Sequence, residues 1–180
     1  MEIHGSTSII MTEQFERAKS AIRNFDAVTP WLYRGGQPGK EGLEALQELG
    51  VKTVISLRWA PKLIEPERKA VEQLGMKFVS TPLNYWNVPT PKIIDEFFDL
   101  IHKEENRPIF IHCLHGADRT GLMIAMYRIT HENWDFKRAY SDMKSHGFHR
   151  YRIRNFKWVL WRYAARHPGS ARLWWFTEAL

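Results

Sequence analysis

The chain contains a single cysteine among its 180 residues, which excludes an internal disulfide framework. It also has no apolar run near the roughly 18 residues that a membrane-spanning helix requires, so none is predicted. The first eight residues lack the basic start and the apolar stretch of a signal peptide. We therefore expect a cytoplasmic location by default, or a periplasmic or exported one if a signal peptide has been removed.

The composition excludes an intrinsically disordered protein, because 44% of the residues are hydrophobic and 13% are aromatic. A chain of this length can bury a sizeable core in one domain. We expect residues 1–25 to be an N-terminal extension that is flexible or partly vector-derived. Residues 26–180 are expected to form a single domain with a basic, helical C-terminal part, and a monomer is the favoured state.

Strand and helix patterns alternate along the chain, which predicts an α/β fold with a mostly parallel central sheet and helices on both faces. Thr90 and Pro91 mark the start of one helix, while Gly50 and Gly75 mark the ends of two others. The predicted strands cover 31–34, 51–57, 76–83 and 108–111, and the predicted helices include 43–49 and 67–74.

The cysteine lies in a ten-residue segment, 112–121, with the sequence HCLHGADRTG, which places Arg119 six positions after Cys113. An apolar run precedes this segment and apolar residues at helical spacing follow it, so a strand, a tight loop and a helix N-terminus meet here. In that geometry the amides from Leu114 to Arg119 converge on one tetrahedral dianion, aided by the helix dipole. Gly116 permits the positive φ that such a loop needs. The predicted substrate-binding residues are Leu114, His115, Gly116, Ala117 and Arg119.

These surroundings favour thiolate over thiol at Cys113, which makes it the expected nucleophile. Arg119 can hold two phosphate oxygens with its planar guanidinium and follow them through a loose transition state. The Thr120 hydroxyl can hydrogen-bond the sulfur as it leaves a phosphocysteine intermediate. His112 is expected to order the loop through its ring nitrogens.

A structural cysteine and a zinc site are the less favoured interpretations of this segment. In the first, the cysteine is merely buried beside an arginine that pairs with a carboxylate. In the second, His112, Cys113 and His115 would be metal ligands, but they lie too close together for tetrahedral coordination, and no second Cys/His pair is present. We expect no metal and no cofactor.

The pattern His-Cys, five residues, then Arg-Thr resembles the signature of the cysteine-dependent protein tyrosine and dual-specificity phosphatase superfamily. Further segments are similar to those of bacterial dual-specificity-like phosphatases: 33–38, 54–58 with Glu65 and Glu67, 89–91, and 147–149. The likeness therefore covers roughly residues 28–160. Segment 89–91 is also similar to the phytases of this superfamily, which dephosphorylate inositol polyphosphates. The resemblance implies a dual-specificity-phosphatase-like fold and hydrolysis of phosphate monoesters through a phosphocysteine.

Acidic residues are missing from 76–94, the region where most relatives carry a general-acid aspartate. Its loop, 84–87, has the sequence NYWN, and an asparagine cannot supply a proton. Asp118 is a candidate within the signature loop itself, a placement also found in the myotubularin and Sac phosphoinositide phosphatases. A carboxylate beside a bound dianion and a thiolate is expected to hold a proton. Alternatively, Asp118 points away and orders the loop by pairing with an arginine, or Asp95 or Glu96 reaches the site.

Basic residues gather near the C-terminus, where 136–166 holds nine Lys or Arg and one acid, Asp142, while the whole chain has a net charge of +6. Such a charge distribution attracts polyanions, and the alternative is a solvated helical face. The interleaved aromatic residues are expected in the core, with base stacking as the alternative; they are Tyr151, Phe156, Trp158, Trp161 and Tyr163. The aromatic tail 173–176 is expected to pack on the domain, rather than bind a partner or a membrane surface.

Three functions remain open. The leading one is a cysteine phosphatase for small polyanionic phosphomonoesters, with inositol polyphosphates first, in which phosphate or sulfate can also occupy the loop. The second is a protein tyrosine or dual-specificity phosphatase acting on a phosphoprotein, because a phenol departs with little help from an acid. The third is a phosphate-binding module on membrane or RNA without turnover, against which the intact Cys113, Arg119 and Thr120 argue. Nucleic acid is the less favoured partner, and peripheral membrane contact stays open.

Overall fold

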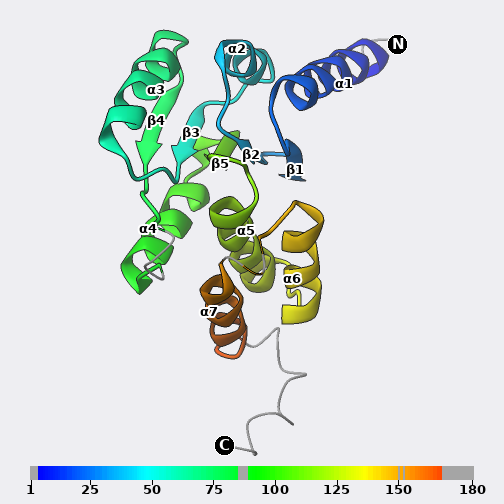
Figure 1. Ribbon diagram of the computed structural model, residues 1–180. Coiled ribbons are helices and arrows are strands. Elements are labelled where there is room, and N and C mark those ends of the chain that lie inside the picture. Colours follow the sequence, from blue (N-terminus) through cyan, green and yellow to red (C-terminus); the bar gives the residue numbers. More distant parts are fainter. Residues whose placement is uncertain (1–3, 85–88, 150, 152, 168–180) are drawn as a thin grey trace, which may run out of the picture.

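The computed structural model describes residues 4–84, 89–149, 151 and 153–167, with side chains from residue 12 onward. Its sheet has the strand order β1-β2-β5-β3-β4 (Figure 1). The strands are β1 (Asp26–Thr29), β2 (Leu32–Gly36), β3 (Thr53–Ser56), β4 (Lys77–Ser80) and β5 (Ile109–Cys113). Only the β1–β2 pair is antiparallel among these described strands. The predicted mostly parallel α/β fold is therefore confirmed.

Helices cover both faces of the sheet. Figure 1 shows α1, α2 and α3 on one side and α4, α5, α6 and α7 on the other. The helices are α1 (His4–Ala21), α2 (Lys40–Glu48), α3 (Pro61–Gln73), α4 (Pro91–His102), the short 3-10 helix η1 (Glu104–Asn106), α5 (Asp118–His131), α6 (Phe136–Ser145) and α7 (Arg154–Ala164). Each side has its own hydrophobic cluster. The central strand β5 contributes to both: Phe110 packs on the α2–α3 side, whereas Ile109 and Ile111 pack on the α5 side.

The helix ends follow from local chemistry. The Thr90 hydroxyl accepts a hydrogen bond from the Ile93 N–H at the start of α4, and Pro91 occupies the first turn. Gly50 and Gly75 follow α2 and α3 with φ of 81° and 77°, a conformation that glycine adopts at little cost. Both signals were predicted correctly. Helix α3 begins earlier than the predicted 67–74, because Pro61 suits its first turn.

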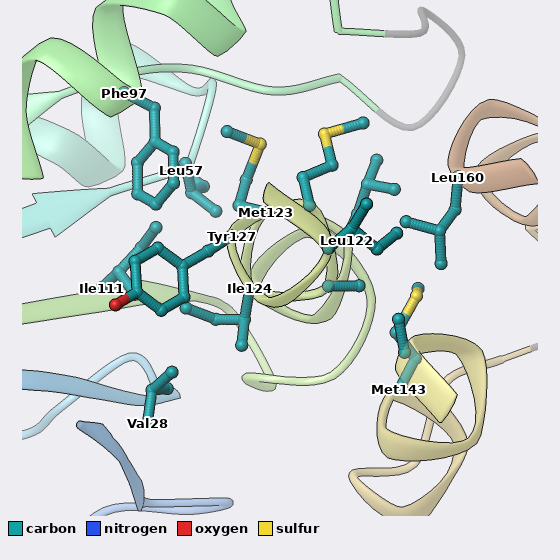
Figure 2. Packing of buried hydrophobic residues seen from close by; sticks show 14 of the residues in the cluster. Val28, Leu57, Phe97, Ile111, Leu122, Met123, Ile124, Tyr127, Met143 and Leu160 are labelled. Carbon is teal, nitrogen blue, oxygen red and sulfur yellow. The ribbon is translucent and has the colours of Figure 1, made fainter. Parts of the chain in front are cut away.

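Helix α5 is the centre of the larger cluster, and side chains surround it on every side. Figure 2 shows Leu122, Met123, Ile124 and Tyr127 projecting from it toward neighbouring elements. Its partners in the picture include Ile111 of β5, Phe97 of α4, Met143 of α6 and Leu160 of α7. A helix buried all round is held firmly by packing. The loop between β5 and α5 is therefore anchored at both ends in the core.

Part of the predicted extension 1–25 belongs to the folded domain, because Ala18, Ile22 and Phe25 are buried against the α2–α3 side. The pattern did not predict α1 or the edge strand β1. Phe156 is buried as expected, but Tyr151 and Trp158 are exposed, which corrects their expected place in the core. Within the described residues, no helix is both long and apolar enough to cross a membrane.

Candidate active site

The ends of the parallel strands bring the predicted site residues to one edge of the sheet. Strand β5 ends at Cys113, whose backbone partner on β2 is Gly36, and His112 pairs with both Gly35 and Ser56. Carboxyl ends of neighbouring parallel strands share an edge, and ligand sites of α/β proteins form there. Cys113 itself is fully buried at this edge.

The loop after Cys113 lies directly on the glycine pair of β2. Gly116 has a φ of 70°, and a Cβ atom added to it would stand 2.4 Å from the backbone carbon of Gly35. A Cβ atom on Gly36 would meet the Leu114 carbonyl oxygen at 3.2 Å. Glycines at 36 and 116 are thus needed for the close approach of two backbones. The prediction of a positive φ at Gly116 is confirmed.

Two side chains from other elements hold the loop carbonyls. Arg34 is fully buried; its Nη2 donates to the Gly116 carbonyl at 3.1 Å, and its Nη1 pairs with Asp142 at 3.2 Å. Burial lowers the pKa of Arg34 to about 10, and the Asp142 carboxylate opposes this shift. Asn24, with a φ of 54°, donates from Nδ2 to the His115 carbonyl at 2.9 Å. Sequence patterns did not predict the Asn24 and Asp142 contacts.

The residue before the cysteine is fixed from the opposite face of the sheet. Alternation along β5 turns the His112 ring toward the α2–α3 side, where it stacks on Phe110 at 5.6 Å between centroids. The His112 Nε2 lies 3.1 Å from Glu67 Oε1, and its Nδ1 lies 3.2 Å from the Cys113 carbonyl oxygen. Ser56 donates to the other oxygen of the Glu67 carboxylate at 3.3 Å. Glu67 of α3 therefore positions the imidazole next to the cysteine.

Arg119 lies in the first turn of α5, almost completely buried. Its Nη1 donates to the carbonyls of Leu57 and Leu83 at 3.2 and 3.4 Å. These carbonyls follow β3 and β4, so the guanidinium lies along the same sheet edge as Cys113. These two hydrogen bonds orient the planar guanidinium, the group that can hold two phosphate oxygens at once.

The other loop residues differ in exposure. Leu114 is exposed, His115 is partly exposed, and Ala117 and Thr120 are buried. Within the described residues, the Thr120 hydroxyl has no hydrogen-bond partner. Desolvation lowers the pKa of His115, and the nearby Arg23 guanidinium lowers it further. This shift favours the neutral form of the His115 ring.

The candidate acid Asp118 is buried and bound by a histidine. Its Oδ1 accepts a hydrogen bond from the His149 N–H at 2.8 Å, and the His149 Nδ1 lies 3.0 Å from its Oδ2. The His149 ring is half-exposed and lies 6.3 Å from the His115 ring, between centroids. The partner is thus a histidine and not the arginine that the loop-ordering alternative expected.

The remaining predicted acids lie elsewhere or outside the description. Asp95 and Glu96 are exposed on α4. Burial raises the pKa of Tyr163 on α7, and the charge of Asp95 adds to this rise. Residues 85–88 of the acid-free loop and the aromatic tail 173–176 lie outside the described residues.

Comparison with known proteins agrees with this geometry. A family model described as "DSP-PTPase phosphatase fused to NAD+ Kinase" matches residues 13–159. The dual specificity protein phosphatase TpbA of Pseudomonas aeruginosa strain UCBPP-PA14 is 34% identical over 125 residues, which cover 69% of this chain and 55% of that protein. The inositol diphosphatase DSP3 of Arabidopsis thaliana is 26% identical over 145 residues, or 76% of this chain and 68% of DSP3. The chain thus spans about half the length of TpbA.

Solved structures are similar as well. A crystal structure of P. aeruginosa TpbA has a TM-score of 0.66 and 29% identity, covering 78% of this chain and 84% of that one. A TpbA structure in complex with pTyr has a TM-score of 0.63 and 27% identity, with coverage of 79% and 91%. The core catalytic domain of the S. cerevisiae PP-IP phosphatase SIW14, in complex with citrate, has a TM-score of 0.64 at 24% identity, covering 77% and 84%. That last similarity concerns the fold alone.

Proposed function

The chain belongs to the family of DSP-PTPase phosphatases whose model it matches, and we propose that it hydrolyses phosphate monoesters with Cys113 as the nucleophile. The observation that carries this proposal is the loop between Cys113 and Arg119. Its backbone is fixed on Gly35 and Gly36, its carbonyls are held by Arg34 and neighbouring side chains, and its arginine lies at the same sheet edge as the thiol. Such a preorganised loop suits a phosphoryl group.

The reaction proceeds in two steps. The Cys113 sulfur attacks phosphorus, the bond from phosphorus to the ester oxygen breaks, and the alcohol leaves with a proton from the enzyme. Water then attacks the phosphocysteine, so that inorganic phosphate forms and the thiolate is released. Arg119 holds the equatorial oxygens in both steps, and Thr120 hydrogen-bonds the leaving sulfur.

Asp118 is the proposed proton donor of the first step and acceptor of the second. It lies one residue before Arg119, at the start of α5, and belongs to the same rigid loop. His149 bonds to both carboxylate oxygens and fixes their orientation. The acid-free sequence of 76–94 supports this assignment, because it leaves the usual upstream position without an acid.

Small polyanionic phosphomonoesters, inositol polyphosphates first, are the proposed substrates. Two arginines border the loop, since Arg23 and Arg119 both act on the His115 ring. The basic residues of α6 and α7 extend this positive field; they are Lys137, Arg138, Lys144, Arg154, Lys157 and Arg162. Similarity to the inositol diphosphatase DSP3 supports the same substrate class.

Phosphotyrosine is the second candidate substrate. It is supported by the higher identity to TpbA and by the TpbA structure with pTyr. A tyrosine phenol is also a good leaving group, so this reaction depends less on Asp118.

A phosphate-release panel tests these proposals. It compares phytate, lower inositol phosphates, phosphoinositides, phosphotyrosine peptides and phosphoserine peptides, with Cys113→Ser as the inactive control. We expect the highest kcat/KM on inositol phosphates, and a preference for phosphotyrosine peptides would select the second candidate instead. Activity that survives Cys113→Ser would overturn the mechanism. No release from any substrate would favour a binding module without turnover.

A further inference from the structure

A pocket of about 400 Å³ opens between α6, the segment that follows it, and α7. Its volume is within the usual range for small-molecule sites, about 300–1,000 Å³. It is lined by Tyr140, Tyr151, Arg154, Lys157 and Trp158. Three aromatic rings and two cations thus face one hollow, and none of the five residues is acidic.

Two of the three aromatic residues of the pocket are largely exposed. Trp158 is 58% exposed and Tyr151 is 78% exposed, far more than large aromatic residues that serve the core. Trp158 is also held in place, because its ring meets that of Trp161 edge-on at 6.1 Å between centroids. A fixed, exposed indole at a pocket wall is a surface on which a planar ring can stack.

The cations of the pocket are not neutralised by their own helices. The single acid of 136–166 is Asp142, and it contacts Arg34 and Arg128 on the side of the phosphate loop. Lys144 and Lys157 both lie near the Tyr140 ring, at 5.3 and 5.6 Å from its centroid. The lining of the pocket, within the described residues, is therefore positively charged, which suits a phosphate group.

The start of α7 adds to this charge. Arg154 is the first residue of the helix, and the Ile153 side chain before it makes no capping hydrogen bond. The positive end of the helix dipole thus faces the same hollow as Arg154 and Lys157.

We propose that this pocket binds a free purine nucleotide, with the base stacked on Trp158 and the phosphates held by Arg154 and Lys157. A nucleotide unites the two chemistries that the lining offers, a planar ring and an anion. An inositol phosphate would use the cations alone and would not stack on the exposed rings. A lipid surface would press on a flat or convex face rather than fill a walled hollow. The proposal is independent of the catalytic function proposed for Cys113.

The pocket is also connected to the catalytic loop. The Tyr140 ring packs edge-on against Phe148, at 5.9 Å between centroids, and the next residue, His149, binds Asp118. A ligand at the pocket therefore contacts the element that orients the candidate acid.

Titration calorimetry with ADP tests the site. The protein is the 180-residue Cys113→Ser chain saturated with tungstate, so that the phosphate loop is both inactive and filled. We expect ADP to bind with an affinity that tungstate does not change. Trp158→Ala should weaken binding about tenfold or more, as expected for loss of a base-stacking ring. Arg154→Gln with Lys157→Gln should weaken it further and reduce its salt dependence.

Matched controls use equally exposed residues away from the pocket. Trp59 is 56% exposed and precedes α3, and Lys62 is exposed within that helix. Trp59→Ala and Lys62→Gln should leave ADP affinity unchanged.

Four results would overturn the proposal. The first is that ADP and tungstate compete for the protein, and the second is that Trp158→Ala leaves the ADP affinity unchanged. The third is that pyrophosphate binds as tightly as ADP. The fourth is that the protein binds a ten-residue oligoadenylate or anionic phosphatidylserine vesicles but does not bind ADP. The last result would assign the surface to nucleic acid or membrane instead.

Discussion

The buried Asp118 carboxylate is bound twice by His149, once by its backbone N–H at 2.8 Å and once by its ring Nδ1 at 3.0 Å. The two residues come from different elements, since Asp118 begins α5 and His149 follows α6. This pair joins the end of the phosphate loop to the basic helices. A change at either residue is therefore expected to act on the loop.

Asp118→Asn tests whether this carboxyl group donates the proton. An alkoxide needs its proton supplied, whereas an activated phenolate departs without it. We expect inositol phosphate hydrolysis to slow about hundredfold or more and aryl phosphate hydrolysis far less.

His149→Ala is the matched control for Asp118→Asn. It removes the ring but keeps the backbone hydrogen bond and the carboxyl group, so most of the proton transfer should survive. Steady-state kcat values on phytate and an aryl phosphate distinguish the two variants. Equal slowing of both substrates by Asp118→Asn would contradict a role in proton donation.

Gly116→Ala should disrupt the loop for two reasons, its positive φ and its contact with the backbone of Gly35. Gly50→Ala separates them, because Gly50 has a similar φ of 81° but open space where its Cβ would lie. We expect Gly50→Ala to cost roughly 1 kcal/mol of unfolding free energy and to keep activity. Gly116→Ala should cost more and lower kcat about hundredfold, since small displacements of reacting groups are that costly. If the two variants lose the same unfolding free energy in urea and keep the same kcat, the contact between Gly116 and the backbone of Gly35 is unimportant.

The sequence predicted those parts of the site that depend on local order. Cys113, Gly116 and Arg119 lie within seven residues, so one strand, one turn and one helix start determine where they sit. The same locality explains why Thr90 and Gly75 marked helix ends correctly. Local patterns carry this information because each element has its own periodicity and end signals.

Support for the loop could not be predicted in the same way, because it comes from distant segments. Arg34 lies 82 residues before Gly116 in the chain, and Glu67 belongs to a helix on the opposite face of the sheet from α5. The sequence indicated Arg34 and Glu67 only as parts of segments that resemble the phosphatase family, and it did not predict that either side chain is buried. Which partner each one meets depends on strand order and helix packing, and periodicity does not contain that information.

Arg34→Met should destabilise the fold, because it removes the partner of Asp142 and the donor to the Gly116 carbonyl. Breaking a buried ion pair from one side costs about 3–5 kcal/mol, and the contact of Asp142 with Arg128 places the expected loss near the lower end. Asp142→Leu and the double variant complete a cycle measured by urea unfolding. We expect the double variant to lose less than the two single losses together. Strict additivity would mean that the pair is not coupled.

Sulfate binding should strengthen as pH falls, because the His115 ring becomes charged. Desolvation first, and then Arg23 and His149, lower the pKa of His115 in the folded protein without a ligand. Below the unfolded value of 6.5 the unfolded chain therefore takes up this proton first, so His115 reduces stability as pH drops. A bound dianion reverses the balance, since it attracts the charged ring.

Sulfate keeps its double negative charge between pH 5 and pH 8, so its affinity reports on the protein alone. Calorimetry over this range should show a severalfold gain toward acid pH in the wild type. His115→Gln should reduce that gain and remove the corresponding loss of stability. His149→Gln measures the contribution of the neighbouring ring, while Asp118 is common to all three proteins. A pH dependence unchanged by His115→Gln would show that the loop histidine does not sense the bound anion.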